Sequence, residues 1–180
     1  MMFWITLIAY EAVWFVSVIG AGRGLSWPAL LAVALFAAWR LRVSTRRSVD
    51  VRLMGLAFAL GLLFDGVAVR SGLLVYAAAW AAGFAPAWIL ALWLAFALTI
   101  VPLFGYLQGR PWLAVAFGAI GGPLAYLGAA RGWQAVRFAP PAWHALLWLA
   151  LGWGISLPLL TTLARRWSRG TAHPLLRSAP

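Results

Sequence analysis

The chain has 180 residues, of which 65% are hydrophobic and only 9% are charged, and its net charge is +11. Soluble domains are usually about half apolar and a quarter charged, so this composition excludes an ordinary soluble domain. The chain has 14 arginines and no lysine, and most of the arginines flank apolar runs. This distribution argues against nucleic-acid binding and favours contacts with anionic lipid headgroups. The absence of cysteine excludes disulfides and thiolate chemistry.

The apolar runs predict the fold class. A helix that crosses the hydrocarbon core of a bilayer needs about 20 apolar residues. We therefore expect an all-α polytopic membrane helical bundle of about six transmembrane helices, plus one short interfacial or re-entrant segment. The spans are predicted at residues 2–20, 28–41, 53–69, 87–106, 112–130 and 143–163. They form a single domain over residues 1–167, and residues 168–180 are expected to form a cytoplasmic tail.

The first span has no basic residues before its apolar run, so we expect it to be retained rather than cleaved as a signal peptide. A glycine-containing loop and Trp27 follow, and Pro28 suits the first turn of the short second span. The hydrophilic stretch RLRVSTRRSVDVR comes next and holds five arginines. The third span carries Asp65 and ends at Arg70.

In the second half of the chain, residues 72–84 are apolar but too short for a full crossing. We expect them to form the interfacial or re-entrant segment. The fourth span, residues 87–106, is the least ambiguous of the six. Gly121, Gly122 and Pro123 interrupt the fifth span, and the sixth leads into a tail rich in arginine.

The arginines also predict the orientation of the bundle. If both termini are cytoplasmic and residues 72–84 do not cross, ten arginines lie on the cytoplasmic side and four on the outer side. The positive-inside rule favours this arrangement. The four arginines expected outside are Arg23, Arg70, Arg131 and Arg137.

Two of the three acidic residues fall inside predicted spans: Glu11 near the middle of the first and Asp65 in the outer half of the third. A carboxylate at such depth costs several kcal/mol unless it is paired, hydrogen-bonded or protonated, so each is a candidate functional residue. The structural alternative pairs Asp65 with Arg70. For Glu11, it is a hydrogen bond across a helix interface to Ser17, Thr99 or a backbone carbonyl.

Three further polar side chains, Tyr126, Arg131 and His144, are predicted on the same outer side as Asp65 and Arg70. Together these five could form a pocket that binds a lipid headgroup or moves a proton. The alternative for His144 and the tyrosines is the interfacial aromatic belt, where such rings sit at headgroup level.

The segment FGAIGGPLAYLG has glycines at Gly118 and Gly122, a spacing that lets two helices approach closely. Gly121, Gly122 and Pro123 also favour a kink, because proline lacks the backbone N–H. Tight packing with a kink is the structural interpretation of this segment. The functional interpretation is a broken helix that lines a cavity.

No cofactor is expected. Two histidines and three acids without a paired histidine motif argue against a catalytic metal. A haem held by His144 and His173 is not expected, since His173 lies in the tail on the opposite side. No phosphate-binding loop, nucleophile elbow or dinucleotide fingerprint is present.

Three strings carry a resemblance to a known family: LGLLFDGVAVRSGLLVY around Asp65, PAWILALWLAFALT, and above all GAIGGPLAYLGAARG. They resemble the bacterial inner-membrane family of domain of unknown function 2878. The resemblance covers nearly the whole chain. It implies a multi-pass protein of the bacterial cytoplasmic membrane and favours work linked to lipids, but it assigns no catalytic residues.

The leading functional hypothesis is a small membrane protein that handles a lipid or another apolar ligand, as an accessory of a lipid-modifying pathway. A second is an intramembrane enzyme that uses Asp65 with Glu11 or His144 as acid and base on a lipid or isoprenoid. A proton-coupled transporter and a purely structural subunit are the remaining alternatives. A second copy of the chain or another membrane protein is a candidate partner.

Overall fold

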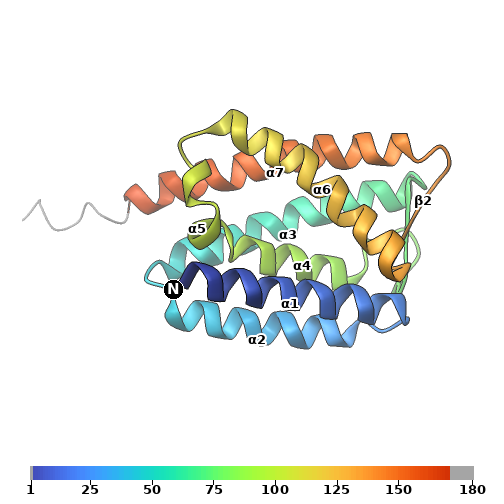
Figure 1. Cartoon of the computed structure of the whole chain (residues 1–180), viewed down its shortest axis with the longest axis horizontal. Helices are drawn as coiled ribbons and strands as arrows, with labels where there is room; N and C mark the ends of the chain where they lie inside the picture. The colour runs from blue at the N-terminus through green and yellow to red at the C-terminus, as the bar shows by residue number, and fades with distance from the viewer. Residues whose placement is uncertain (1, 171–180) are drawn as a thin grey trace, which may run out of the picture.

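The computed structural model describes residues 2–170 of the chain (Figure 1). The predicted tail falls mostly on residues 171–180, which lie outside the described residues. The elements are α1 (Met2–Gly22), α2 (Trp27–Val43), α3 (Arg47–Arg70), β1 (Leu74–Tyr76), α4 (Ala87–Ala97), α5 (Ile100–Leu103), the 3₁₀ turn η1 (Gly105–Leu107), α6 (Pro111–Trp133), β2 (Val136–Phe138) and α7 (Trp143–Gly170). The helical fold class is confirmed.

Among the described residues, four helices are long and apolar enough to cross a membrane: α1, α3, α6 and α7. The prediction of six such helices is therefore wrong, and the two differences lie in α2 and α4. The second predicted span corresponds to α2, which has 17 residues and carries Arg40 and Arg42 in its last turn. Its apolar part is about 14 residues, or roughly 21 Å at 1.5 Å per residue, which is short of a hydrocarbon core of about 30 Å.

The fourth predicted span, residues 87–106, is not one helix. Helix α4 ends at Ala97, and a short turn separates it from α5 and the 3₁₀ turn η1. The N–H of Thr99 and its hydroxyl both bond to the carbonyl of Phe96, which tightens the chain at this point. Pro102, inside α5, has no N–H to bond to the carbonyl of Leu98, so one α-helical hydrogen bond is missing at this point.

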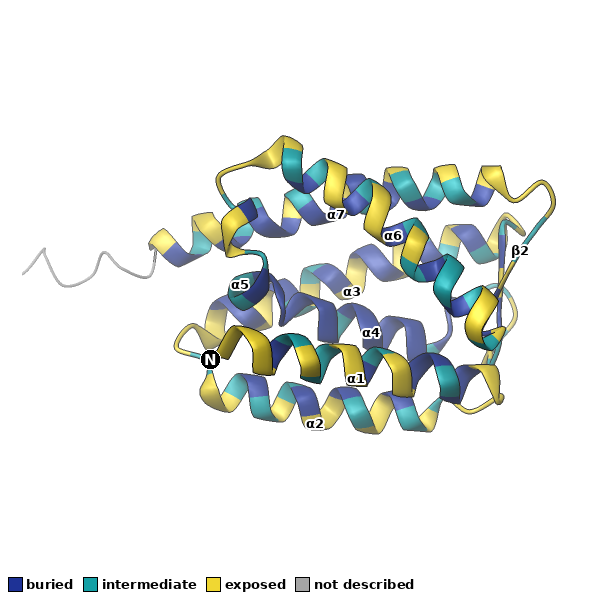
Figure 2. Cartoon of the chain, viewed as in Figure 1, coloured by how far each residue is buried: buried dark blue, intermediate teal, exposed yellow. Residues whose placement is uncertain are grey.

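The uniform apolarity of α4 has a different cause from the one predicted. Nearly every residue of α4 is buried, because α1, α2 and α3 pack around it (Figure 2). A helix that is hydrophobic on all sides is surrounded either by lipid or by protein, and its sequence looks the same in both cases. Here the surrounding material is protein.

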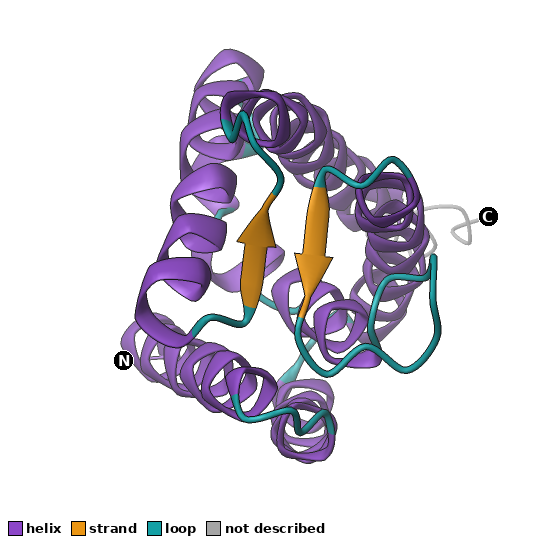
Figure 3. Cartoon of the chain, turned by 90° about the vertical axis from the view of Figure 1, so that its right-hand side faces the viewer, coloured by secondary structure: helices purple, strands orange, loops and turns teal. Residues whose placement is uncertain are grey.

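Residues 72–84, predicted as an interfacial or re-entrant segment, form strand β1 and a loop. Strand β1 pairs antiparallel with β2, with Leu74 opposite Phe138 and Tyr76 opposite Val136. Leu74 and Tyr76 are buried while Val75 is exposed, which is the period-two pattern of a strand. The two strands lie across one end of the bundle and do not pass through it (Figure 3).

The outward-facing surface of the long helices is apolar. Trp4 and Ile8 on α1, Leu63 on α3, and Trp112 and Ile120 on α6 are all largely exposed. In water such a surface would be an association hazard, whereas in a bilayer it is solvated by lipid tails. The surface therefore agrees with the four helices that are able to cross a membrane.

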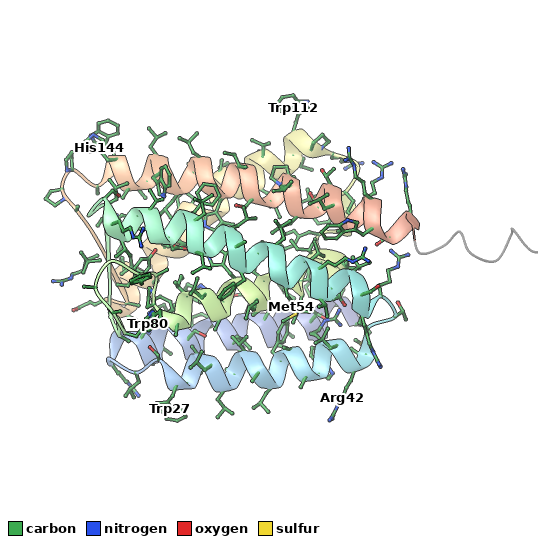
Figure 4. All side chains as sticks on the ribbon, turned by 180° about the vertical axis from the view of Figure 1, so that it is seen from behind. Trp27, Arg42, Met54, Trp80, Trp112 and His144 are labelled. Atoms are coloured by element: carbon green, nitrogen blue, oxygen red, sulfur yellow. The ribbon has the colours of Figure 1, made fainter. Side chains whose placement is uncertain are left out.

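The start of α1 and the end of α7 lie at the same end of the bundle (Figure 1). Arg42 marks this end, and His144 and Trp80 lie at the opposite end, beside the strands (Figure 4). We call these the arginine-rich end and the strand end. The two ends differ in charge because eight of the thirteen described arginines lie around the α2–α3 loop and in the last two turns of α7: Arg40, Arg42, Arg46, Arg47, Arg52, Arg165, Arg166 and Arg169.

Candidate functional site

Asp65 lies on α3 and is almost completely buried, with 1% of its surface exposed. Its Oδ1 accepts hydrogen bonds from the hydroxyls of Tyr76 and Tyr126, the latter at 2.7 Å. Its Oδ2 accepts a bond of 2.6 Å from the indole Nε1 of Trp93. These donors come from β1, α6 and α4, so a single carboxyl group joins four separate elements of the fold. We call Asp65, Tyr76, Trp93 and Tyr126 the aspartate cluster.

The chemistry of the aspartate cluster explains how a carboxyl group can lie inside an apolar bundle. Both oxygens act as acceptors, as those of an ionised carboxylate do, and all three donors are neutral. Hydrogen bonds to a carboxylate are among the stronger ones in proteins, and they replace the water that burial removes.

Close packing of glycine against tryptophan positions the indole donor of this cluster. A Cβ atom at Gly61, one turn before Asp65 on α3, would lie 2.5 Å from the Trp93 ring. The Trp93 ring stacks on Trp153 of α7 with centroids 4.3 Å apart and an interplanar angle of 9°. Trp153 in turn lies against Gly122 of α6, where a Cβ would be 2.3 Å from its ring.

Of the residues predicted to surround Asp65, the structure brings only Tyr126 to it. Arg70 instead donates from Nε to the carbonyl of Gly83 at 3.2 Å and lies over the ring of Phe84. Arg131 is exposed near the end of α6. His144 is exposed at the start of α7, with its ring beside that of Trp143.

Sequence reasoning missed two partners of Asp65. Tyr76 was assigned to an interfacial segment, and its contact depends on the pairing of β1 with β2, which lie 60 residues apart in the chain. Trp93 lies in the fourth predicted span, residues 87–106, where no functional role was predicted for it. A carboxylate at membrane depth requires donors, and tyrosine hydroxyls and tryptophan indoles are donors that occur within the apolar runs of this chain, so they were candidates to examine.

A groove of about 410 Å³ lies between α1 and α6, with α4 and α7 forming its floor. Glu11 on α1 and Phe117 on α6 are exposed at its edges, so the groove opens at the side of the bundle. Tyr126 and Trp93 line it, whereas Asp65 lies behind them and does not. The aromatic lining residues are Tyr10, Trp14, Trp88, Trp93, Phe96, Phe104, Phe117, Tyr126 and Trp153.

Glu11 is the one charged residue among the described residues that line this groove. It lies near the midpoint of α1, and its side chain is exposed. Neither hydroxyl predicted as its partner bonds to it: Ser17 donates to the carbonyl of Val13 and Thr99 to that of Phe96. Within residues 2–170, no hydrogen bond or ion pair joins Glu11 to another group.

The third acid, Asp50, belongs to a different region near the arginine-rich end. It is buried at the start of α3, and the charge of Arg40 on α2 attracts it. Thr6 on α1 is buried as well. The Thr6 hydroxyl, the Arg40 Nε and one Asp50 oxygen have no hydrogen-bond partner within the described part of the chain.

The glycines of α6 have two different environments. A Cβ at Gly118 would lie 2.1 Å from the carbonyl oxygen of Trp153, and Gly122 is equally tight against the Trp153 ring. These two glycines therefore allow α6 and α7 to pack closely. Gly121 has nothing within 4 Å of its Cβ position and lines the groove. Pro123 lies inside α6, which continues to Trp133.

The fold and the site together define a small helical protein with four described helices able to cross a membrane, a side groove and a buried aspartate cluster. Residues 3–159 match the family described as "Protein of unknown function (DUF2878)", and the chain belongs to this family. The resemblance expected from the sequence is thus confirmed. No curated protein and no solved structure matches the chain. Within residues 2–170 there is no group of three or more His, Cys, Asp or Glu side chains that could hold a metal ion.

Proposed function

We propose that this protein binds a lipid or another apolar ligand in the groove between α1 and α6. The observation that carries the proposal is the groove itself, with about 410 Å³ of space and walls that are mostly aromatic. Ligand sites are typically concave, apolar pockets of about 300–1,000 Å³ with a few polar groups. Because the groove opens at the side of the bundle between two long apolar helices, a ligand dissolved in the bilayer can enter it directly.

The aspartate cluster supports this proposal as a structural element behind the groove. Trp93 and Tyr126 are fixed by their bonds to Asp65, and both present the rest of their rings to the groove. Because these rings are fixed, the groove keeps its shape when no ligand is bound. A preformed site loses less entropy when a ligand binds.

The bundle is proposed to lie in a bacterial cytoplasmic membrane with its arginine-rich end in the cytoplasm. The charge difference between the two ends supports this orientation. The role of an accessory in a lipid-modifying pathway remains part of the same proposal. An acid–base enzyme that pairs Asp65 with His144 has less support, because His144 is exposed beside Trp143 while the oxygens of Asp65 already accept three bonds.

The test compares lipids that co-purify with the wild type and with a variant whose groove is filled. Gly121→Leu places a side chain in the groove, because Gly121 lines the groove and nothing lies within 4 Å of its Cβ position. Gly55→Leu is the matched control, since Gly55 is exposed on α3, also has open space at its Cβ and does not line the groove. Native mass spectrometry of protein extracted from membranes measures the bound lipid.

We expect bound lipid on the wild type and on Gly55→Leu, and little or none on Gly121→Leu. Equal occupancy on all three proteins, or no bound lipid on any of them, would contradict the proposal. Unfolding temperatures measured by tryptophan fluorescence show whether each variant is folded.

A further inference from the structure

Two of the three acidic residues have partners for their carboxyl groups within residues 2–170, and Glu11 does not. Asp65 accepts three hydrogen bonds, and Asp50 is attracted by the charge of Arg40. Glu11 has no hydrogen bond or ion pair within residues 2–170, although it lies near the middle of a helix long enough to cross a membrane. An ionised carboxyl group at that depth is costly unless a partner compensates its charge, and the group is otherwise held in its protonated form.

The described arginines do not supply that partner. They lie toward the two ends of the bundle, in loops, in strand β2 and in the first two or last two turns of helices. None of them lines the groove, and neither does a histidine. In a chain whose net charge is +11, the one charged side chain that lines the groove is thus negative. A positive group must come from outside the described chain if Glu11 is to be paired.

The remaining walls of the groove also suit a positive group. Nine of its lining side chains are aromatic, including Trp14 and Tyr10 close to Glu11 on α1 and Trp153 on the floor. The face of an aromatic ring attracts cations, tryptophan most strongly, and the attraction grows when water is excluded. Aromatic rings together with a carboxylate are a recurrent way to bind quaternary ammonium groups and similar ions.

We propose that the groove binds a hydrophobic organic cation, with the positive group between Glu11 and the aromatic rings and the apolar part along α4 and α6. The ligand class is that of lipophilic amines, quaternary ammonium ions and phosphonium ions. This inference rests on the proposed ligand-binding function of the groove and adds the charge of the ligand. A neutral ligand leaves Glu11 unpaired, and an anionic one is repelled by it.

The test uses two ions of nearly the same shape and opposite charge, tetraphenylphosphonium and tetraphenylborate. Their binding to the full chain in lipid nanodiscs is measured by equilibrium dialysis against empty nanodiscs, which corrects for partition into lipid. The proteins compared are the wild type, Glu11→Gln, Glu11→Asp and Gly121→Leu. Glu11→Gln removes the charge while keeping the size of the side chain, and Glu11→Asp keeps the charge.

We expect Glu11→Gln to weaken the binding of tetraphenylphosphonium by at least about tenfold, the scale of a desolvated cation contact. Glu11→Asp should retain more of the affinity than Glu11→Gln. Binding of tetraphenylborate should be unchanged or stronger in Glu11→Gln, and the unfolding temperature shows that each variant is folded. Gly121→Leu should weaken the binding of tetraphenylphosphonium because it fills the groove.

Equal affinity of the wild type and Glu11→Gln for tetraphenylphosphonium would overturn the inference. If Gly121→Leu still lowered that affinity, the groove would bind apolar ligands without selecting their charge, and the proposed function would stand alone. If neither substitution had an effect, the inference and the proposed function would both fail.

Discussion

At the scale of single residues, Asp65 has the largest number of side-chain partners in the candidate site. Its carboxyl group holds β1, α4 and α6 against α3 through bonds from Tyr76, Trp93 and Tyr126. All four side chains are buried. Removing the acceptor leaves three buried donors unsatisfied, which costs more than the loss of a single donor.

We therefore predict that Asp65→Ala lowers the free energy of unfolding by roughly 3 kcal/mol or more, at about 1–3 kcal/mol for each donor left without an acceptor. Unfolding in detergent micelles, followed by tryptophan fluorescence, measures the change. Tyr76→Phe and Tyr126→Phe are the comparison variants. Each removes one donor and leaves the other two bonds to Asp65, so each should cost only about 1 kcal/mol. An Asp65→Ala protein as stable as Tyr126→Phe would show that the cluster does not hold the fold together.

The residue scale also shows where sequence reasoning ends. A carboxylate at membrane depth could be identified from Asp65 alone, and Tyr126 could be assigned to the same side of the membrane. Tyr76 could not be assigned to Asp65, because its place depends on the pairing of residues 74–76 with residues 136–138. No local pattern encodes a pairing between segments so distant in the chain.

At the scale of elements, the apolar runs located α1, α3, α6 and α7 to within a few residues, with the largest difference at the start of α3 and the end of α7. The start of α3 was placed late because Arg47 and Arg52 are hydrophilic, although a helix can begin outside the hydrocarbon core. Helix α4 was misjudged because hydropathy measures the apolarity of a segment and does not distinguish lipid from protein as its surroundings. The turn at Thr99 separates α4 from α5, so residues 87–106 do not form one helix long enough to cross a membrane.

The contact between α6 and α7 gives a prediction at this scale. Gly118→Ala should destabilise the protein by about 1–3 kcal/mol, because its Cβ would lie 2.1 Å from the Trp153 carbonyl oxygen and the helices would have to separate. Gly121→Ala, less than one turn away on the same helix, has open space at its Cβ. It should be neutral or stabilise the helix by up to about 1 kcal/mol. Unfolding temperatures of the two variants give the comparison. Equal losses in both would mean that alanine disturbs α6 itself and that close packing at Gly118 is not the cause.

At the scale of the whole molecule, the two ends of the bundle differ in charge. The α2–α3 loop with Thr45 lies at the arginine-rich end, and the loop after β1 with Ala79 lies at the strand end. The sequence predicted this separation from the arginines, and it depended on residues 72–84 not crossing the membrane. Those residues remain at the strand end, although as a strand and loop. An odd number of additional crossings would have placed the arginines of α7 at the opposite end.

The lack of cysteine makes the orientation directly measurable, since each introduced cysteine is the single thiol of the chain. We predict that a membrane-impermeant maleimide labels Ala79→Cys in intact spheroplasts and labels Thr45→Cys only after the membrane is permeabilised. Both positions are exposed, so access to them depends on the side of the membrane and not on burial. The reverse pattern would mean that the arginine-rich end faces outward, against the positive-inside rule. Labelling of both positions in intact spheroplasts would mean that the bundle has no single orientation across the membrane, which would also contradict the prediction.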